Sequence, residues 1–151
     1  MFHVVLVHPE IPHNTGAAGR LCLATGSTLH LIEPLGFSLD EKHVRRVGLD
    51  YWKDVTLKVW PDWNTFLSKT QATRLHFCTT KATKSLWETN FTVGDYLVFG
   101  CETKGLPESI RDADPGARVR IPMLAESTRS LNLSTSIAIV LYEAARQISP
   151  R

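Results

Sequence analysis

The chain has 151 residues, a formal net charge of +2 and a sequence pI near 8.5. Its length fits one domain, residues 1–151, and its weak charge gives no argument for nucleic-acid binding unless a local patch supplies one. The three cysteines are odd in number and widely spaced, so we expect reduced core thiols in a cytoplasmic protein. The first apolar run is too short to span a membrane and lacks the features of a signal peptide.

Apolar, β-branched runs alternate with helical patterns along the chain. The runs predict strands at residues 2–8, 28–33, 55–60, 74–80, 95–100 and 118–122. Helices are expected at about residues 15–25, 39–47, 62–70, 107–113 and 133–148. Because several strands are apolar on both faces, the pattern predicts an α/β fold with a mainly parallel sheet flanked by helices. Ligands of such sheets bind in the loops that leave the carboxyl ends of the strands.

The loop after the first strand, HPEIPHNTGAAGR, leads into the first expected helix. Asn14 or Thr15 is a plausible N-cap of that helix. Two glycines within the helical pattern indicate that another part of the protein approaches its backbone closely. Arg20 lies at the edge of the apolar stripe and is either a surface arginine or a site residue.

A second loop, GCETKGLP, follows the fifth expected strand. Gly100 and Gly105 permit left-handed backbone and let a ligand lie against bare backbone. The sequence is not a phosphate-binding P-loop, because leucine and proline follow where that motif requires lysine and then serine or threonine. Glu102 is either offered to a pocket or is an ordinary carboxylate of a surface turn.

The third loop, IPMLAESTRSLNLSTS, precedes the last expected helix. Ser130 or Asn132 is placed to cap that helix. The same helix start presents free N–H groups and a partial positive charge, which suits an anionic group. Capping and ligand binding do not exclude each other here.

Six stretches together resemble one family over nearly the whole chain: EIPHNTGAAGRLC, LHLIEPLGF, RRVGLDYW, GDYLVFGCETKGLP, RVRIPM and RSLNLSTSIAIVLYEAARQ. They are similar to the SPOUT class of RNA methyltransferases, and most closely to its TrmL (YibK-like) group. That group methylates the ribose 2′-oxygen of the tRNA wobble nucleotide, a cytidine or uridine at position 34. The resemblance implies a C-terminal trefoil knot, bound S-adenosylmethionine, a homodimer, and the tRNA anticodon stem-loop as substrate.

The resemblance also implies the site residues. The cofactor would lie against Cys78, Thr79, Gly100, Glu102, Gly105, Ile121, Met123, Ser130 and Leu131. The catalytic residues would be Arg20, Asn14, Ser130, Asn132 and Glu102. Since arginine is a poor general base, we expect Arg20 to clamp a phosphate and to stabilise charge on the attacking oxygen. No metal is expected, because a sulfonium transfers its methyl group to a hydroxyl without one.

RNA contact is expected from Arg20 and from Lys42, Arg45 and Arg46. The last three can share one helix face. A solvated charged face explains the last three equally well. Two other functions remain open within the family resemblance: methylation of another tRNA or rRNA position, and a non-catalytic RNA-binding factor of the same fold. An ordinary nucleotide-dependent enzyme is disfavoured, because the chain lacks the dinucleotide fingerprint.

Overall fold

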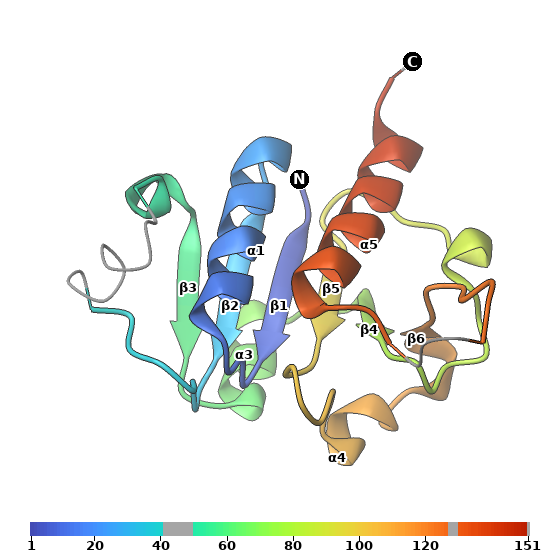
Figure 1. The fold of residues 1–151 in the computed structure, drawn as a ribbon, viewed down its shortest axis with the longest axis horizontal. Coiled ribbons are helices and arrows are strands. Elements are labelled where there is room, and N and C mark those ends of the chain that lie inside the picture. The colour runs from blue at the N-terminus through green and yellow to red at the C-terminus, as the bar shows by residue number, and fades with distance from the viewer. Residues whose placement is uncertain (41–49, 127–129, 151) are drawn as a thin grey trace.

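The protein is a single parallel sheet with helices on both faces (Figure 1). The computed structural model describes residues 1–40, 50–126 and 130–150. The strands are β1 (His3–Val7), β2 (Thr28–Ile32), β3 (Leu57–Trp60), β4 (Leu75–Cys78), β5 (Tyr96–Phe99) and β6 (Arg118–Val119). They lie in the order β3-β2-β1-β5-β4-β6, and every pairing is parallel. The six expected strands and the parallel sheet are confirmed.

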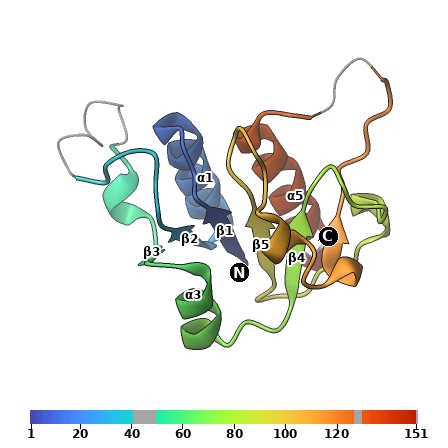
Figure 2. The same cartoon turned by 90° about the horizontal axis from the view of Figure 1, so that it is seen from below.

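Within the described residues, two long helices cover one face of the sheet and two short ones the other. The helices are α1 (Pro12–Thr25), α3 (Trp63–Thr70), α4 (Glu108–Arg111) and α5 (Leu133–Ile148). Three 3₁₀ turns are η1 (Trp52–Asp54), η2 (Leu86–Glu88) and η3 (Pro115–Ala117). Figure 2 shows α1 and α5 side by side on one face, with α3 on the opposite face. The helix expected at residues 39–47 falls, from residue 41 on, outside the described residues.

The side chains of β1 explain why its sequence is apolar without alternation. Val4 and Leu6 pack into the core beneath α1 and α5, whereas Val5 and Val7 pack into the core beneath α3 and α4. Successive residues of a strand point to opposite faces. A strand covered on both faces therefore needs an apolar residue at every position.

The helix α5 begins and ends where the sequence predicts. Ile137, Leu141 and Ala144 of its apolar stripe are buried against the sheet. Asn132 is its N-cap, and the side-chain oxygen of Asn132 accepts a hydrogen bond from the backbone N–H of Ser134 (2.9 Å). Asn132 is thus the helix cap that the sequence allowed.

The start of α1 differs from the prediction. The helix begins at Pro12, so Asn14 and Thr15 lie inside it, and its N-cap Ile11 has no capping side chain of its own. Proline suits a first helical position, because its missing N–H has no partner there in any case. The expected close approach is found at Gly19, where a Cβ atom would lie 2.8 Å from the ring of Trp52.

The connection from β4 to β5 runs along the outer edge of the sheet. Ser85 in this connection pairs with Arg120, which follows β6. Farther on, the side-chain nitrogen of Gln147 in α5 donates to the backbone oxygen of Thr89 (2.9 Å), and its side-chain oxygen accepts from the N–H of Phe91 (2.9 Å). The connection therefore contacts both β6 and the C-terminal part of α5.

Two neighbouring histidines, buried His30 and half-buried His3, lie on the α3 face of the sheet. The indole N–H of Trp60 donates to Nδ1 of His30 (3.0 Å), so His30 carries its proton on Nε2 and donates it to Nδ1 of His3 (2.9 Å). His3 stacks on the ring of Tyr96 at 4.1 Å. Burial, and to a lesser degree the nearby His3 and Lys58, lowers the pKa of His30 from 6.5 to about 3.

Acid should therefore weaken folding before carboxylates titrate. The unfolded chain protonates His30 near pH 6.5, whereas the folded chain keeps it neutral to about pH 3. The contribution of His30 to the free energy of unfolding is complete above the pKa of the unfolded state, near 6.5, and is lost as the pH falls. Urea unfolding should give a free energy roughly 2 kcal/mol lower at about pH 5 than at about pH 7.5. His30→Gln should show a smaller fall, and an equal fall in both proteins would contradict this assignment.

Candidate functional site

A cavity of about 280 Å³ lies beyond the carboxyl ends of β4, β5 and β6. Residues 78–81 line it from the end of β4, residues 99–106 from the end of β5, and parts of 119–123 and 130–136 complete it. All nine residues that the family resemblance assigns to the cofactor are among its lining residues. The structure thus brings together segments that are far apart in the sequence.

The two glycines of the second loop have different roles. A Cβ atom at Gly100 would collide with the carbonyl carbon of Gly105 and the backbone nitrogen of Leu106. The loop folds back on itself here, and Cys101 and Gly105 exchange two backbone hydrogen bonds (3.1 and 3.3 Å). Gly105 has a positive φ of 69°, and a Cβ atom there would meet nothing within 4 Å. Gly100 therefore serves the loop's own fold, and only Gly105 leaves open space.

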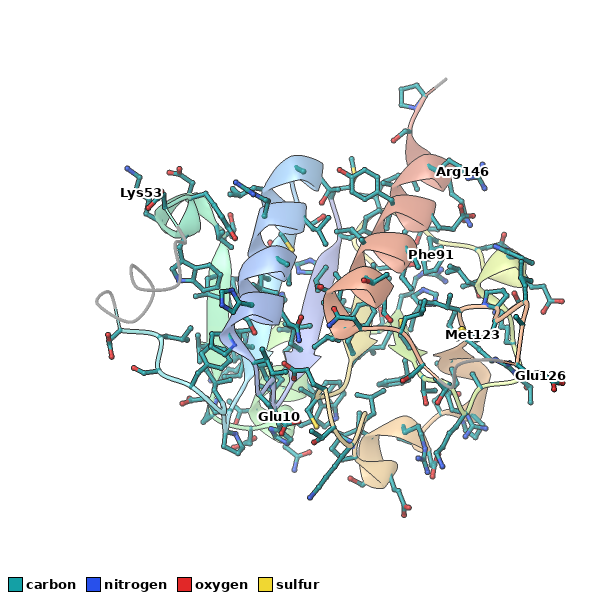
Figure 3. All side chains as sticks on the ribbon, in the orientation of Figure 1. Glu10, Lys53, Phe91, Met123, Glu126 and Arg146 are labelled. Carbon is teal, nitrogen blue, oxygen red and sulfur yellow. The ribbon has the colours of Figure 1, made fainter. Side chains whose placement is uncertain are left out.

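Two glutamates join the first loop to the second, and we call this arrangement the carboxylate clasp. The carboxylate of Glu102 accepts hydrogen bonds from the N–H groups of Glu10 (2.8 Å) and Ile11 (2.6 Å) and from the amide of Asn14 (3.2 Å). In return, Oε1 of Glu10 accepts from the N–H (3.0 Å) and hydroxyl (2.7 Å) of Thr103. These bonds from Thr103 lower the pKa of Glu10. Figure 3 shows Glu10 where β1 gives way to α1.

The clasp holds the two residues that precede α1. Glu102 lies 92 residues beyond Glu10, and its carboxylate accepts the N–H groups of Glu10 and of the N-cap residue Ile11. Both of its oxygens are engaged, so the geometry makes it a positioning residue. Glu10 was not among the site residues predicted from the sequence, and its only signal there was an acidic residue just before a helix start.

The lining also includes residues that the sequence analysis did not select. Lys81 contributes positive charge, Arg111 is paired with Asp112, and Phe99 and Leu106 contribute apolar surface. Burial raises the pKa of the Cys78 thiol to about 12, so this thiol stays protonated and is not a nucleophile. The cavity can hold an organic ligand with polar and apolar parts, but this thiol offers no covalent chemistry.

The three cysteines are free, as expected, but they are not all core residues. Cys22 is buried, whereas Cys78 and Cys101 line the cavity. Among residues 1–40, 50–126 and 130–150, no group of three or more histidine, cysteine or acidic side chains is arranged to hold a metal ion. No helix of the described chain is long and apolar enough to cross a membrane.

The residues expected at the reactive end are only partly brought together. Ser130 and Glu102 line the cavity, whereas Asn14, Arg20 and Asn132 are not among its described lining residues. Asn14 reaches the site through Glu102, and Asn132 caps α5. The guanidinium of Arg20 lies on the exposed side of α1, 4.7 Å from the centre of the Tyr51 ring.

The other predicted RNA-binding residues, Lys42, Arg45 and Arg46, lie outside the described residues. The aromatic residues that follow them are described and are engaged within the protein. Tyr51 donates its hydroxyl to the backbone oxygen of Gly16 (2.7 Å), and Trp52 packs against α1.

The clasp predicts an effect of Glu102→Gln on folding. The substitution places an amide group against backbone N–H donors, so the free energy of unfolding should fall by about 2 kcal/mol. Glu108→Gln, at the exposed start of α4, is the matched control and should change it by less than about 0.5 kcal/mol. Urea titrations of both variants make the comparison. Equal stability of the two would mean that the clasp does not hold the loops.

The chain matches the SpoU rRNA Methylase family over residues 1–142. It is 48% identical to a tRNA (cytidine(34)-2'-O)-methyltransferase from Acidovorax sp. (strain JS42), over 99% of this chain and 93% of that protein. A solved structure concerned with the 2-OH methylation of C/U34 on tRNA superposes with a TM-score of 0.90 and 42% identity, covering 98% of this chain and 96% of that one.

A more distant structure shares the fold. The SpoU methyltransferase AviRb from Streptomyces viridochromogenes, in complex with the cofactor AdoMet, gives a TM-score of 0.82 at 24% identity. The match covers 96% of this chain and 59% of AviRb. Family match, full-length identity and fold agree, and the chain belongs to the SpoU rRNA methylase family.

Proposed function

We propose that this protein transfers a methyl group from S-adenosylmethionine to the ribose 2′-oxygen of a cytidine or uridine at position 34 of tRNA. The observation that carries the proposal is the convergence of all nine expected cofactor residues on one cavity in a chain of this family. The full-length identity to a tRNA (cytidine(34)-2'-O)-methyltransferase supports the target nucleotide.

The reaction needs alignment more than reactive side chains. The ribose hydroxyl attacks the methyl carbon and gives up its proton to a phosphate or to water. The carbon–sulfur bond breaks, and its electron pair removes the positive charge on sulfur. An enzyme promotes such a displacement by holding oxygen, carbon and sulfur in line. Here the backbone of the second loop and of residues 121–123 would hold the donor, with Gly105 leaving room for it. The clasp through Glu102 fixes that loop.

A homodimer is part of the proposal. The outer sides of α1 and α5 expose Leu23 (38%), Ile139 (37%) and Tyr142 (50%), and the two helices lie next to each other (Figure 1). Exposed apolar side chains on two adjacent helices suit a second copy of the chain. A dimer through this face would also explain why Arg20 does not line the cavity of its own chain. We propose that Arg20 serves the cavity of the partner subunit.

We also infer a trefoil knot in the C-terminal half. The connection between β4 and β5 contacts β6 at Ser85 and α5 at Gln147. From β6 at the sheet edge, the chain must pass this connection to reach α5 over the middle of the sheet. This crossing supports the knot. It also supports treating residues 1–151 as one domain, since α5 packs on strands from both halves of the chain.

The test is incubation with methyl-labelled S-adenosylmethionine and unfractionated tRNA, followed by nucleoside mapping. We expect label in 2′-O-methylcytidine or 2′-O-methyluridine at position 34. Ribose label elsewhere would assign the enzyme to another position. Label in a base would overturn the proposed reaction, and RNA binding without transfer would indicate a non-catalytic factor.

Arg20→Lys tests the assigned role of the guanidinium. Lysine keeps the charge but cannot bind a phosphate through two parallel hydrogen bonds, so kcat/KM should fall by about 100-fold. Arg146→Lys, an exposed arginine of α5 paired with Glu143, is the control and should retain normal activity. Light scattering should show the same oligomer for both variants. Near-normal turnover of Arg20→Lys would exclude the two-bond clamp.

A further inference from the structure

A basic and aromatic surface lies at the β6 edge of the sheet, outside the cavity. It consists of Lys84, Trp87 and Arg120, and we call it the edge surface. All three side chains are exposed, and Trp87 is 67% exposed. In Figure 1 the turn η2, which carries Trp87, lies at the opposite end of the sheet from β3.

Backbone pairing places the segment that carries Lys84 and Trp87 beside Arg120. Ser85 pairs with Arg120, while the N–H of Arg120 donates to the oxygen of Lys84 (2.9 Å) and the N–H of Leu86 donates to the oxygen of Arg120 (2.8 Å). Leu86 and Val119 are buried on the inner side of this pairing. Because neighbouring residues of extended backbone alternate in direction, Arg120 points to the same side as Ser85, opposite to Leu86 and Val119. Lys84 is exposed at the position just before Ser85.

The backbone that carries Trp87 is held rigidly. The hydroxyl of Ser85 accepts from the N–H of Trp87 (3.1 Å), and the carboxylate of Glu88 accepts from the N–H of Ser85 (3.4 Å). Thr89 closes the turn by donating its N–H to the oxygen of Leu86 (3.1 Å). A large apolar ring is therefore presented to solvent from an ordered turn.

The edge surface adjoins the lining of the cavity along the chain. Arg120 immediately precedes Ile121, and Lys84 lies three residues after Lys81. Both Ile121 and Lys81 line the cavity. A ligand chain that leaves the cavity on this side meets Lys81 first and then the edge surface.

We propose that the edge surface binds unpaired nucleotides next to the methylated one, with a base stacked on Trp87 and phosphates on Lys84 and Arg120. Single-stranded RNA is held in this way, by aromatic faces with cations along the backbone. The carboxylate of the nearby Glu88 accepts a hydrogen bond from the N–H of Ser85 and keeps its negative charge, but two cations against one acid leave the surface positive. This inference rests on the proposed function, because it takes the occupant of the neighbouring cavity to act on RNA.

The experiment compares two RNA probes: a synthetic stem-loop with the anticodon-arm sequence of a methylated tRNA, and a blunt RNA duplex of equal length. Trp87→Ala should weaken stem-loop binding by about 5- to 30-fold, since one stacked base is lost. Trp87→Phe should retain most of the affinity, because it keeps a ring. Binding of the duplex and of S-adenosylhomocysteine should be unchanged by either variant.

The cations are tested through the salt dependence of stem-loop binding. Lys84→Gln and Arg120→Gln should each reduce the slope of log K against log salt by about 0.7. The controls are Lys69→Gln, an exposed lysine of α3 on the other face of the sheet, and Val93→Ala, an apolar side chain that is 70% exposed. Both controls should bind the stem-loop like the unmodified protein.

The proposal is overturned if Trp87→Ala binds the stem-loop normally, or if it weakens duplex or S-adenosylhomocysteine binding to the same extent. An unmodified protein that binds no RNA would overturn it as well. If the stem-loop binds in a Trp87-dependent manner but receives no methyl group, the proposed function fails while the edge surface stands.

Discussion

The carboxylate of Glu102 joins two loops that lie 88 to 92 residues apart in the chain, and the candidate site depends on this contact. The loops meet because β1 and β5 are adjacent parallel strands whose carboxyl ends reach the same edge of the sheet. Glu10 reinforces the contact from the other side through Thr103. The wall of the cavity is thereby anchored to the start of α1.

A fixed loop matters because the proposed methyl transfer requires little reactive chemistry from side chains. The displacement depends on the alignment of oxygen, carbon and sulfur. Movement of the loop that holds the donor would therefore lower the rate of methyl transfer. The turn at Gly100 and the two hydrogen bonds between Cys101 and Gly105 fix the loop from within. The clasp fixes it from outside. Together they leave Gly105 as bare backbone beside open space.

Sequence patterns predicted the parts of the fold that depend on local repetition. The apolar stripe of α5 and the continuous apolar strands follow from helical and extended geometry, and both are confirmed. The family resemblance selected the nine lining residues, because the motifs of a family include loop residues that meet only in the folded protein. Composition and spacing alone indicated only which loops to examine.

Long-range contacts could not be predicted in the same way. The start of α1 was placed too late because the helix begins at Pro12 without a capping side chain, and the N–H of its N-cap residue Ile11 is bound by Glu102, far along the chain. Gly100 was expected to make room for a ligand. Instead, its lack of a side chain lets the loop fold back on itself. The edge surface was not predicted, because neither segment's sequence indicates that Ser85 pairs with Arg120. Each of these depends on which segments the sheet makes neighbours.

The central claim is that the cavity formed by the folded-back second loop binds the methyl donor. Calorimetric titration with S-adenosylhomocysteine tests it directly, using Gly100→Ala to disturb the loop and Gly116→Ala, where an added Cβ meets only ordinary contact, as the control. We predict saturable one-site binding for the unmodified protein and for Gly116→Ala, and loss of binding for Gly100→Ala. Absence of binding to the unmodified protein, or undiminished binding to Gly100→Ala, would contradict the account.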